Sequence, residues 1–150
     1  MNCFVCANEY DSEEKKNGRV YLACPHCGEY FLNDSNEKPD YNFSPKNVAN
    51  VSGWVRAQNS LSTIPELNTE TIGRVLLLPF PPVIERAKKL LLEIARRNDE
   101  LGESVDLKDR CYYSISYSKS KSELELLLKL LKEHDWITYE EEYLEILWSC

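Results

Sequence analysis

The sequence CFVC at residues 3–6 and the sequence CPHC at residues 24–27 decide the fold of the N-terminal part of this chain. In each of them two cysteines are separated by two residues, and residues 7–23 separate the two pairs. This spacing is typical of structural zinc sites, in which two CxxC turns face one another and surround one ion. We therefore predict that one structural zinc ion is held by four thiolates, those of Cys3, Cys6, Cys24 and Cys27.

The residues between and after the cysteine pairs have the composition of a small sheet. Asn17-Gly18 is a strong two-residue turn signal, and the sequence VYL at residues 20–22 favours a strand. The sequence YFL at residues 30–32 predicts a further strand. Gly28 follows the second pair and lets the backbone turn amide groups toward sulfur, whereas Ala7 takes this place after the first pair. Residues 1–34 are thus expected to form a zinc ribbon with a looser first turn.

Redox chemistry is disfavoured for these cysteines, because a redox CxxC normally stands alone at the start of a helix. Four thiolates complete a tetrahedron, so no ligand position is left for water or substrate, and catalysis by the metal is disfavoured as well. His26 lies inside the second pair and is expected to point to solvent. About 35 residues bury too little apolar surface to fold alone, so the expected role of the ion is to fold this segment.

A polar linker at residues 35–43 leads to a mainly helical region at residues 44–150. Ser44-Pro45 is a helix start with serine as the N-cap, and Asn68 or Thr69 caps a second helix that the proline-rich residues 79–82 end. A third helix is expected over about 82–98, with a buried side formed by Ile84, Ala87, Leu91 and Ile94, which Leu90 and Leu92 widen.

Residues 82–148 have the order of a winged helix-turn-helix, in which three helices precede two strands. We expect the second helix to begin at Asp106 and the third to cover residues 119–134, where leucines recur at helical spacing. Two strand-like runs follow, on either side of residues 140–142. Plain three-helix packing with a C-terminal hairpin or a fourth helix fits the same pattern. The predicted fold class is α+β, a small β zinc ribbon followed by an α-rich, winged-helix-like domain.

The remaining reactive side chains have ordinary explanations. Cys111 is expected to be a buried core thiol and Cys150 an incidental terminal thiol, since free cysteine usually behaves as a small apolar residue. His134 falls at the end of a helix, where the helix dipole favours an imidazole. The sequence contains no glycine-rich phosphate loop and no GxSxG or HExxH motif, so we expect no catalytic residues.

Composition indicates a soluble cytoplasmic protein. Hydrophobic residues make up 43% of the sequence and charged residues 29%, which is the balance of a globular protein able to bury a core. Neither a membrane helix nor a signal peptide is expected, and paired cysteines in a reducing cytosol favour metal binding over disulfides. The net charge of -7 disfavours nucleic-acid partners, whose affinity rests on basic residues.

DNA binding would depend on the helix expected over residues 119–134. Its solvent face lacks the Arg, Asn and Gln side chains that usually read bases, and offers instead a mixed set, Glu123, Glu125, Lys129, Lys132 and Glu133. Lysine and arginine are frequent between residues 86 and 121, but they form a basic surface only if the neighbouring acidic residues point elsewhere. Charge therefore favours a protein partner, with nucleic acid as the alternative.

Four segments together resemble the N-terminal module of a group of poorly characterised bacterial proteins, namely CPHCGEYFL at 24–32, SGWVRAQN at 52–59, PPVIERAKKLLLEIARR at 81–97 and SKSELELLLKLLKEHDWI at 120–137. In those proteins a zinc ribbon and a winged-helix-like unit precede a larger effector, often a Toll/interleukin-1-receptor-like nucleotide-binding domain associated with antiphage defence. The resemblance implies an accessory role in sensing, assembly or regulation. This chain stops at Cys150 without an effector domain. The resemblance thus implies that it acts by contacting something else if it is complete, and that its activity lies in the missing part if it is a fragment.

These observations predict a zinc-stabilised, non-enzymatic protein-interaction or regulatory module in a prokaryotic cytosol, with an effector subunit of an antiphage system as the partner that the resemblance implies. The alternative is a DNA-binding winged-helix transcriptional regulator. A third hypothesis is a cryptic nucleotide-processing enzyme, because catalytic side chains need to be adjacent in space and not in sequence.

Overall fold

The computed structural model of the protein describes residues 2–33, 43–97, 104–106, 109–140 and 145–147. Within these residues it contains two three-stranded antiparallel sheets and five helices, so the predicted α+β class is confirmed. The predicted linker at 35–43 lies almost wholly outside the described residues. The division of the chain into residues 1–34 and 44–150 stays a prediction.

The N-terminal sheet contains β1 (Ser12–Lys16), β2 (Arg19–Cys24) and β3 (Gly28–Asn33), in the order β1-β2-β3. The predicted hairpin turn is confirmed, because Lys16 pairs with Arg19 and the two residues between them have positive φ, 53° at Asn17 and 72° at Gly18. Such a turn matches the right-handed twist of the strands that it joins. Strands β2 and β3 pair up to Cys24 and Gly28, and the chain reverses between these two residues at the second cysteine pair.

Helices α1 (Pro45–Ser60) and α2 (Thr69–Leu77) begin where the sequence predicted them. The Ser44 hydroxyl accepts a hydrogen bond from the Asn47 amide at 3.2 Å, and the Asn68 side chain accepts one from Thr71 at 2.8 Å. Each satisfies an amide that has no partner within its helix. Between the two helices the chain returns to the sheet, because the Phe31 amide donates to the Pro65 carbonyl at 2.8 Å.

The C-terminal part contains α3 (Val83–Arg97), β4 (Ser104–Asp106), α4 (Cys111–Ile115), α5 (Lys121–Glu133), β5 (Thr138–Glu140) and β6 (Glu145–Leu147). The prediction that a helix begins at Asp106 is wrong, since Asp106 ends β4 and α4 begins at Cys111. Strand β4 pairs with β6, which lies some forty residues further along the chain, and local sequence does not show such a partner. The three strands have the order β4-β6-β5.

The predicted buried face of α3 is only partly right. Leu90 and Ile94 are fully buried, whereas Ile84 is 66% exposed. Arg86 is buried instead, and its guanidinium donates to the Ser116 carbonyl at 2.9 Å and contacts the Glu123 carboxylate at 3.3 Å. The predicted leucine face of α5 is confirmed, because all four of its members are buried: Leu124, Leu127, Leu128 and Leu131.

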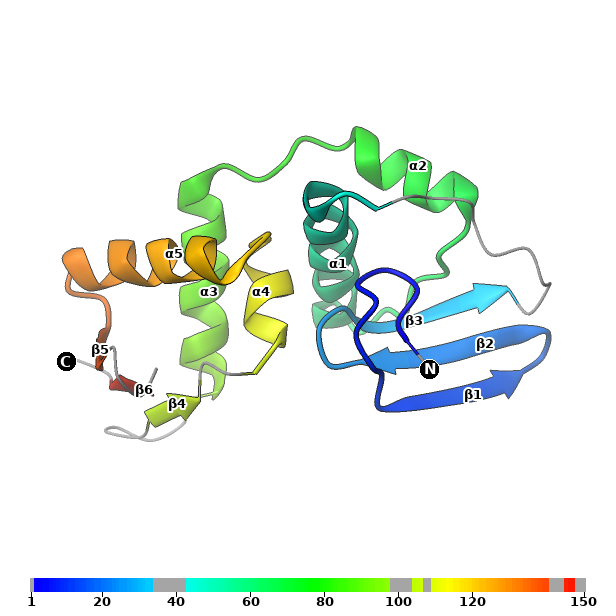
Figure 1. Ribbon diagram of the computed structural model, residues 1–150, viewed down its shortest axis with the longest axis horizontal. Coiled ribbons are helices and arrows are strands. Elements are labelled where there is room, and N and C mark those ends of the chain that lie inside the picture. The colour runs from blue at the N-terminus through cyan, green and yellow to red at the C-terminus, as the bar shows by residue number, and fades with distance from the viewer. Residues whose placement is uncertain (1, 34–42, 98–103, 107–108, 141–144, 148–150) are drawn as a thin grey trace.

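Helix α1 lies between the N-terminal sheet and the C-terminal helices (Figure 1). It packs against β3 on one side and against α4 on the other, while α3 packs against α4 and α5. The buried residues form two clusters. One joins the N-terminal sheet to α1 and α2, and the other lies among α3, α4 and α5. None of the described helices has the length and apolar character to cross a membrane.

Candidate metal centre

The four predicted cysteines meet at one end of the N-terminal sheet. Their sulfur atoms lie within 4.8 Å of one another, with Sγ of Cys3 3.8 Å from that of Cys27 and Sγ of Cys6 3.6 Å from that of Cys24. A disulfide would bring two sulfurs to about 2.0 Å, so all four thiols are free. A tetrahedral ion with metal–sulfur bonds of about 2.3 Å places its sulfurs about 3.8 Å apart. The cluster therefore has the dimensions of a four-thiolate metal site.

Two left-handed residues shape the turns that carry the cysteines. Gly28, after the second pair, has φ of 94°, and Ala7, after the first pair, has φ of 60°. Alanine accepts this conformation at a cost of about 1–2 kcal/mol, whereas glycine accepts it freely. The Cys27 amide points at Sγ of Cys24 from 3.4 Å, as predicted for the second turn. The greater looseness of the first turn stays a prediction.

Burial and mutual hydrogen bonds make the four thiols unequal. Hydrogen bonds from Cys24, Cys27 and Cys6 hold the pKa of the Cys3 thiol far below its ordinary value, whereas burial raises the pKa of the Cys27 thiol. The Tyr30 hydroxyl lies within hydrogen-bond distance of Sγ of Cys3, at 3.0 Å, and burial raises the pKa of Tyr30.

Arg56 of α1 holds the second turn from outside. Its guanidinium donates to the carbonyl oxygen of His26 at 3.2 Å, to that of Cys24 at 3.4 Å, and to that of Pro25. The Ser114 hydroxyl of α4 donates to the same His26 carbonyl. Carbonyls at a tight turn have no partners within it, so these donors fix the position of the cysteines that flank the turn.

The expectation that His26 points to solvent is wrong. Its side chain is half-buried, and its ring stacks on Tyr113 of α4 with a centroid distance of 6.0 Å and an interplanar angle of 24°. Desolvation lowers the pKa of His26, which favours the neutral ring. The second cysteine turn therefore packs between α1 and α4. The sequence alone could not show its contact with α4.

Asn59, one turn beyond Arg56 on α1, binds the first residue after Gly28. Its side-chain oxygen accepts from the Glu29 amide at 2.8 Å, and its side-chain nitrogen donates to the Glu29 carbonyl at 2.9 Å. A methyl group at Gly28 would lie 2.4 Å from that side-chain oxygen. Sequence analysis missed Arg56 and Asn59 as supports of the site. Their spacing of three residues, which places them on one helix face, was a signal too common to single them out.

Comparison with known proteins finds no relative of this chain. No family model, no curated protein and no solved structure matches it. Evidence about the function therefore comes from the cysteine cluster and from the surface of the molecule.

Cys111 and His134, which the sequence also singled out, have structural roles. Cys111 is buried, as predicted, and burial raises the pKa of its thiol to about 12. Its sulfur lies 2.8 Å from the Arg97 guanidinium. His134 ends α5, where its amide donates to the Leu130 carbonyl at 3.3 Å, which agrees with the predicted capping position. Cys150 lies outside the described residues.

Proposed function

We propose that Cys3, Cys6, Cys24 and Cys27 bind one structural zinc ion and that residues 1–34 form a zinc ribbon around it. The sulfur separations, the burial and the Tyr30 hydroxyl support this assignment, and soft thiolates favour zinc in a reducing compartment. Bound zinc would join the two turns and contribute on the order of 10 kcal/mol to folding. Because the chain itself supplies four ligands, the proposed site is closed to substrate.

Residues 82–148 are proposed to form a winged-helix-like unit. Its elements follow the order helix, strand, helix, helix, strand, strand, and its strands have the order β4-β6-β5. This arrangement supports the proposal, because it places the first strand beside the last one and leaves α5 in the place of a recognition helix.

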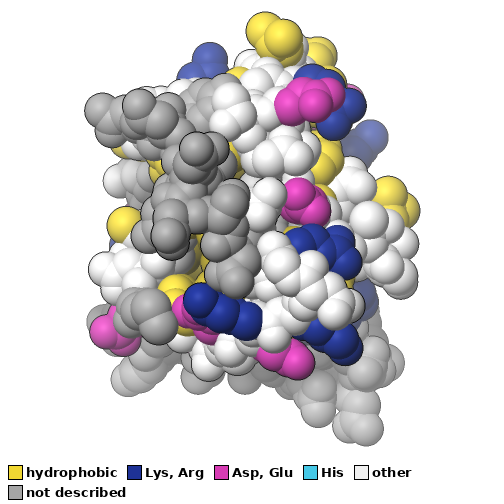
Figure 2. All heavy atoms as spheres, turned by 90° about the vertical axis from the view of Figure 1, so that its right-hand side faces the viewer, with side chains coloured by type: hydrophobic (Ala, Val, Ile, Leu, Met, Phe, Trp, Pro, Cys, Tyr) yellow, Lys and Arg dark blue, Asp and Glu magenta, His cyan; other side chains and the backbone are white. Residues whose placement is uncertain are grey.

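The proposed function is that of a non-enzymatic protein-interaction or regulatory module. The observation that carries it is a group of exposed aliphatic side chains at the connection between α2 and α3, which we call the apolar connection. Their exposed fractions are 86%, 50%, 55% and 66% for Leu77, Leu78, Val83 and Ile84. On the face drawn in Figure 2, one group of hydrophobic side chains lies at the top with basic and acidic side chains directly beside and below it, and other hydrophobic side chains are scattered lower down. Exposed apolar side chains that lie together on a surface mark protein contacts.

Charge supports a protein partner over DNA. Five of the nine lysines and arginines from residue 86 to residue 121 contact a carboxylate, which lowers the charge that they offer to a long DNA backbone: Arg86 and Lys119 contact Glu123, Arg96 and Arg97 contact Glu93, and Lys121 contacts Glu125. The outer face of α5 exposes Leu126, and Trp136 is exposed just after the helix. These apolar groups stand where a DNA-binding protein carries its base-reading side chains, and they form no hydrogen bonds with phosphates or with base edges.

An accessory role beside an effector subunit in prokaryotic antiphage defence is proposed on the resemblance alone. A winged-helix transcriptional regulator is the second candidate, and the observation that favours it is the strand order of the C-terminal sheet.

Site-specific photo-crosslinking at the apolar connection tests the proposal. A crosslinker placed at Val83 should capture one partner in the source cell, and the additional substitution Leu77→Ser should abolish the capture. Leu61→Ser is the matched control, because Leu61 is 73% exposed but lies at the end of α1, and it should leave capture unchanged. Equal loss with both substitutions would refute this docking surface. Salt-sensitive binding to duplex DNA below micromolar concentration would favour the regulator, and turnover of nucleotides would favour the enzyme.

A further inference from the structure

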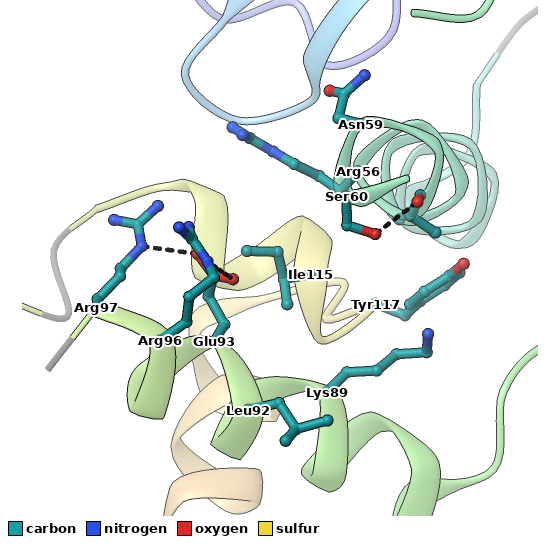
Figure 3. Close-up of a pocket in the computed structure, with 12 residues that line it drawn as sticks. Arg56, Asn59, Ser60, Lys89, Leu92, Glu93, Arg96, Arg97, Ile115 and Tyr117 are labelled. Carbon is teal, nitrogen blue, oxygen red and sulfur yellow. Dashed lines mark hydrogen bonds and ion pairs between the residues drawn. The ribbon is translucent and has the colours of Figure 1, made fainter. Parts of the chain in front are cut away.

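A cleft of about 590 Å³ lies between α1 and α3, with α4 along its base (Figure 3). Arg56, which donates to carbonyls of the second cysteine turn, also lines this cleft. Lys89 extends from α3 toward Tyr117, and Arg96 and Arg97 converge on Glu93 (Figure 3). A cleft of this volume falls within the range of small-molecule sites, which is roughly 300–1,000 Å³.

Positive charge is concentrated in this cleft. Four basic residues line it, Arg56, Lys89, Arg96 and Arg97, together with one carboxylate, that of Glu93. Outside the lining, Asp109 also contacts Arg97, at 2.8 Å. Four positive charges against two negative ones leave a surplus of two, in a chain whose net charge is -7.

Several donors in the cleft are available to a ligand. Lys89 forms no ion pair with another described residue. The known bonds of Arg56 use Nε and Nη2, and those of Arg96 use the same two nitrogens, so Nη1 of each has no partner within the described part of the chain. Guanidinium groups match the paired oxygens of phosphate, and an ammonium group adds a point charge beside them.

We propose that this cleft binds a small phosphate-bearing molecule of nucleotide size. A diphosphate carries two or three negative charges, so it neutralises a surplus of two positive charges better than a single carboxylate does. Leu92 and Ile115 also line the cleft and give it an apolar side against which a base can lie. This proposal is independent of the protein-interaction proposal, because it rests on a different surface.

The carboxylate of Glu93 provides a direct test of the proposal. Its carboxylate contacts Arg96 at 2.6 Å and Arg97 at 2.8 Å, and so occupies guanidinium groups that a phosphate would use. A phosphate must compete with this carboxylate. Removal of the carboxylate charge should therefore strengthen binding, whereas removal of the Lys89 charge should weaken it.

Isothermal titration calorimetry on the full, metal-loaded chain tests the site, with ADP as the probe and adenosine as the uncharged control. ADP should bind below millimolar, and adenosine at least about tenfold more weakly, since charged hydrogen bonds of this strength correspond to a factor of ten or more. Lys89→Gln should weaken ADP binding about tenfold on the same grounds, and Glu93→Gln should strengthen it.

Lys88→Gln is the matched control, because Lys88 is the exposed neighbour of Lys89 on α3 and does not line the cleft. It should leave ADP affinity unchanged within about twofold, as expected for a screened surface charge. The proposal is overturned if ADP does not bind below millimolar, if Lys88→Gln weakens binding as much as Lys89→Gln does, or if Glu93→Gln weakens it. Circular dichroism of each variant shows that a lost affinity is not a lost fold.

Discussion

Substitution of Gly28 by alanine probes the contact between the second cysteine turn and α1. Gly28 has φ of 94°, and an added methyl group would lie 2.4 Å from the Asn59 side-chain oxygen and 3.2 Å from Cδ of Arg56. Gly18 provides a matched control, because its φ is 72° and a methyl group there meets nothing within 4 Å. Both positions have positive φ, and the two substitutions differ in whether the side chains of Asn59 and Arg56 must move.

The expected difference follows from these contacts. Gly18→Ala should lower the free energy of unfolding by about 1–2 kcal/mol, the cost of a left-handed alanine. Gly28→Ala adds the displacement of Asn59 and the loss of its two hydrogen bonds to Glu29, each of which contributes about 0.5–1.5 kcal/mol. The free energy of unfolding of Gly28→Ala should therefore fall by about 2–5 kcal/mol.

Urea unfolding followed by circular dichroism measures both changes on protein of the same metal content. The rate at which a chromogenic chelator removes metal provides a second readout, and it should rise for Gly28→Ala more than for Gly18→Ala. If the two variants lose equal stability and release metal at equal rates, then α1 does not hold the second turn, and the role given to Asn59 and Arg56 is wrong.

Two further predictions concern the buried clusters. Cys24→Ser should release the metal and raise amide hydrogen exchange in the N-terminal sheet, α1 and α2, which share one cluster, while α3 and α5 keep their protection. Uniform loss of protection across all five helices would show that the chain unfolds as one unit. Unchanged exchange throughout would show that the cysteines have no structural role. Leu128→Ala should lower the free energy of unfolding by about 2–5 kcal/mol, since Leu128 is 1% exposed. Leu126→Ala, at a site 65% exposed on the same helix, should stay within about 0.5 kcal/mol, and a cost comparable to that of Leu128→Ala would mean that the buried face of α5 is misassigned.

Local chemistry was enough to predict several elements. Ser44 and Asn68 cap their helices through their own side chains, and Asn17-Gly18 sets a turn by its own backbone preference. The cysteine spacing likewise predicted which four sulfur atoms meet, because two tight turns joined by a hairpin have few ways to face each other.

Features that depend on distant partners could not be predicted. Strand β4 exists through its pairing with β6, and periodicity gave no sign of it. Helix α3 is apolar over much of its surface, so its pattern fits a buried Ile84 as well as the buried Leu90 that the structure has. The His26 carbonyl and the Arg56 guanidinium meet because the second turn packs between α1 and α4. The two residues are 30 positions apart in the sequence, so local sequence does not show the contact.

The metal content of the purified protein tests the central claim most directly. Protein prepared under reducing conditions without chelators should contain one zinc ion per chain by elemental analysis. X-ray absorption should show four sulfur neighbours at about 2.3 Å. A folded protein without bound metal, or an ion whose neighbours include nitrogen or oxygen, would contradict the claim that these four cysteines form a closed structural zinc site.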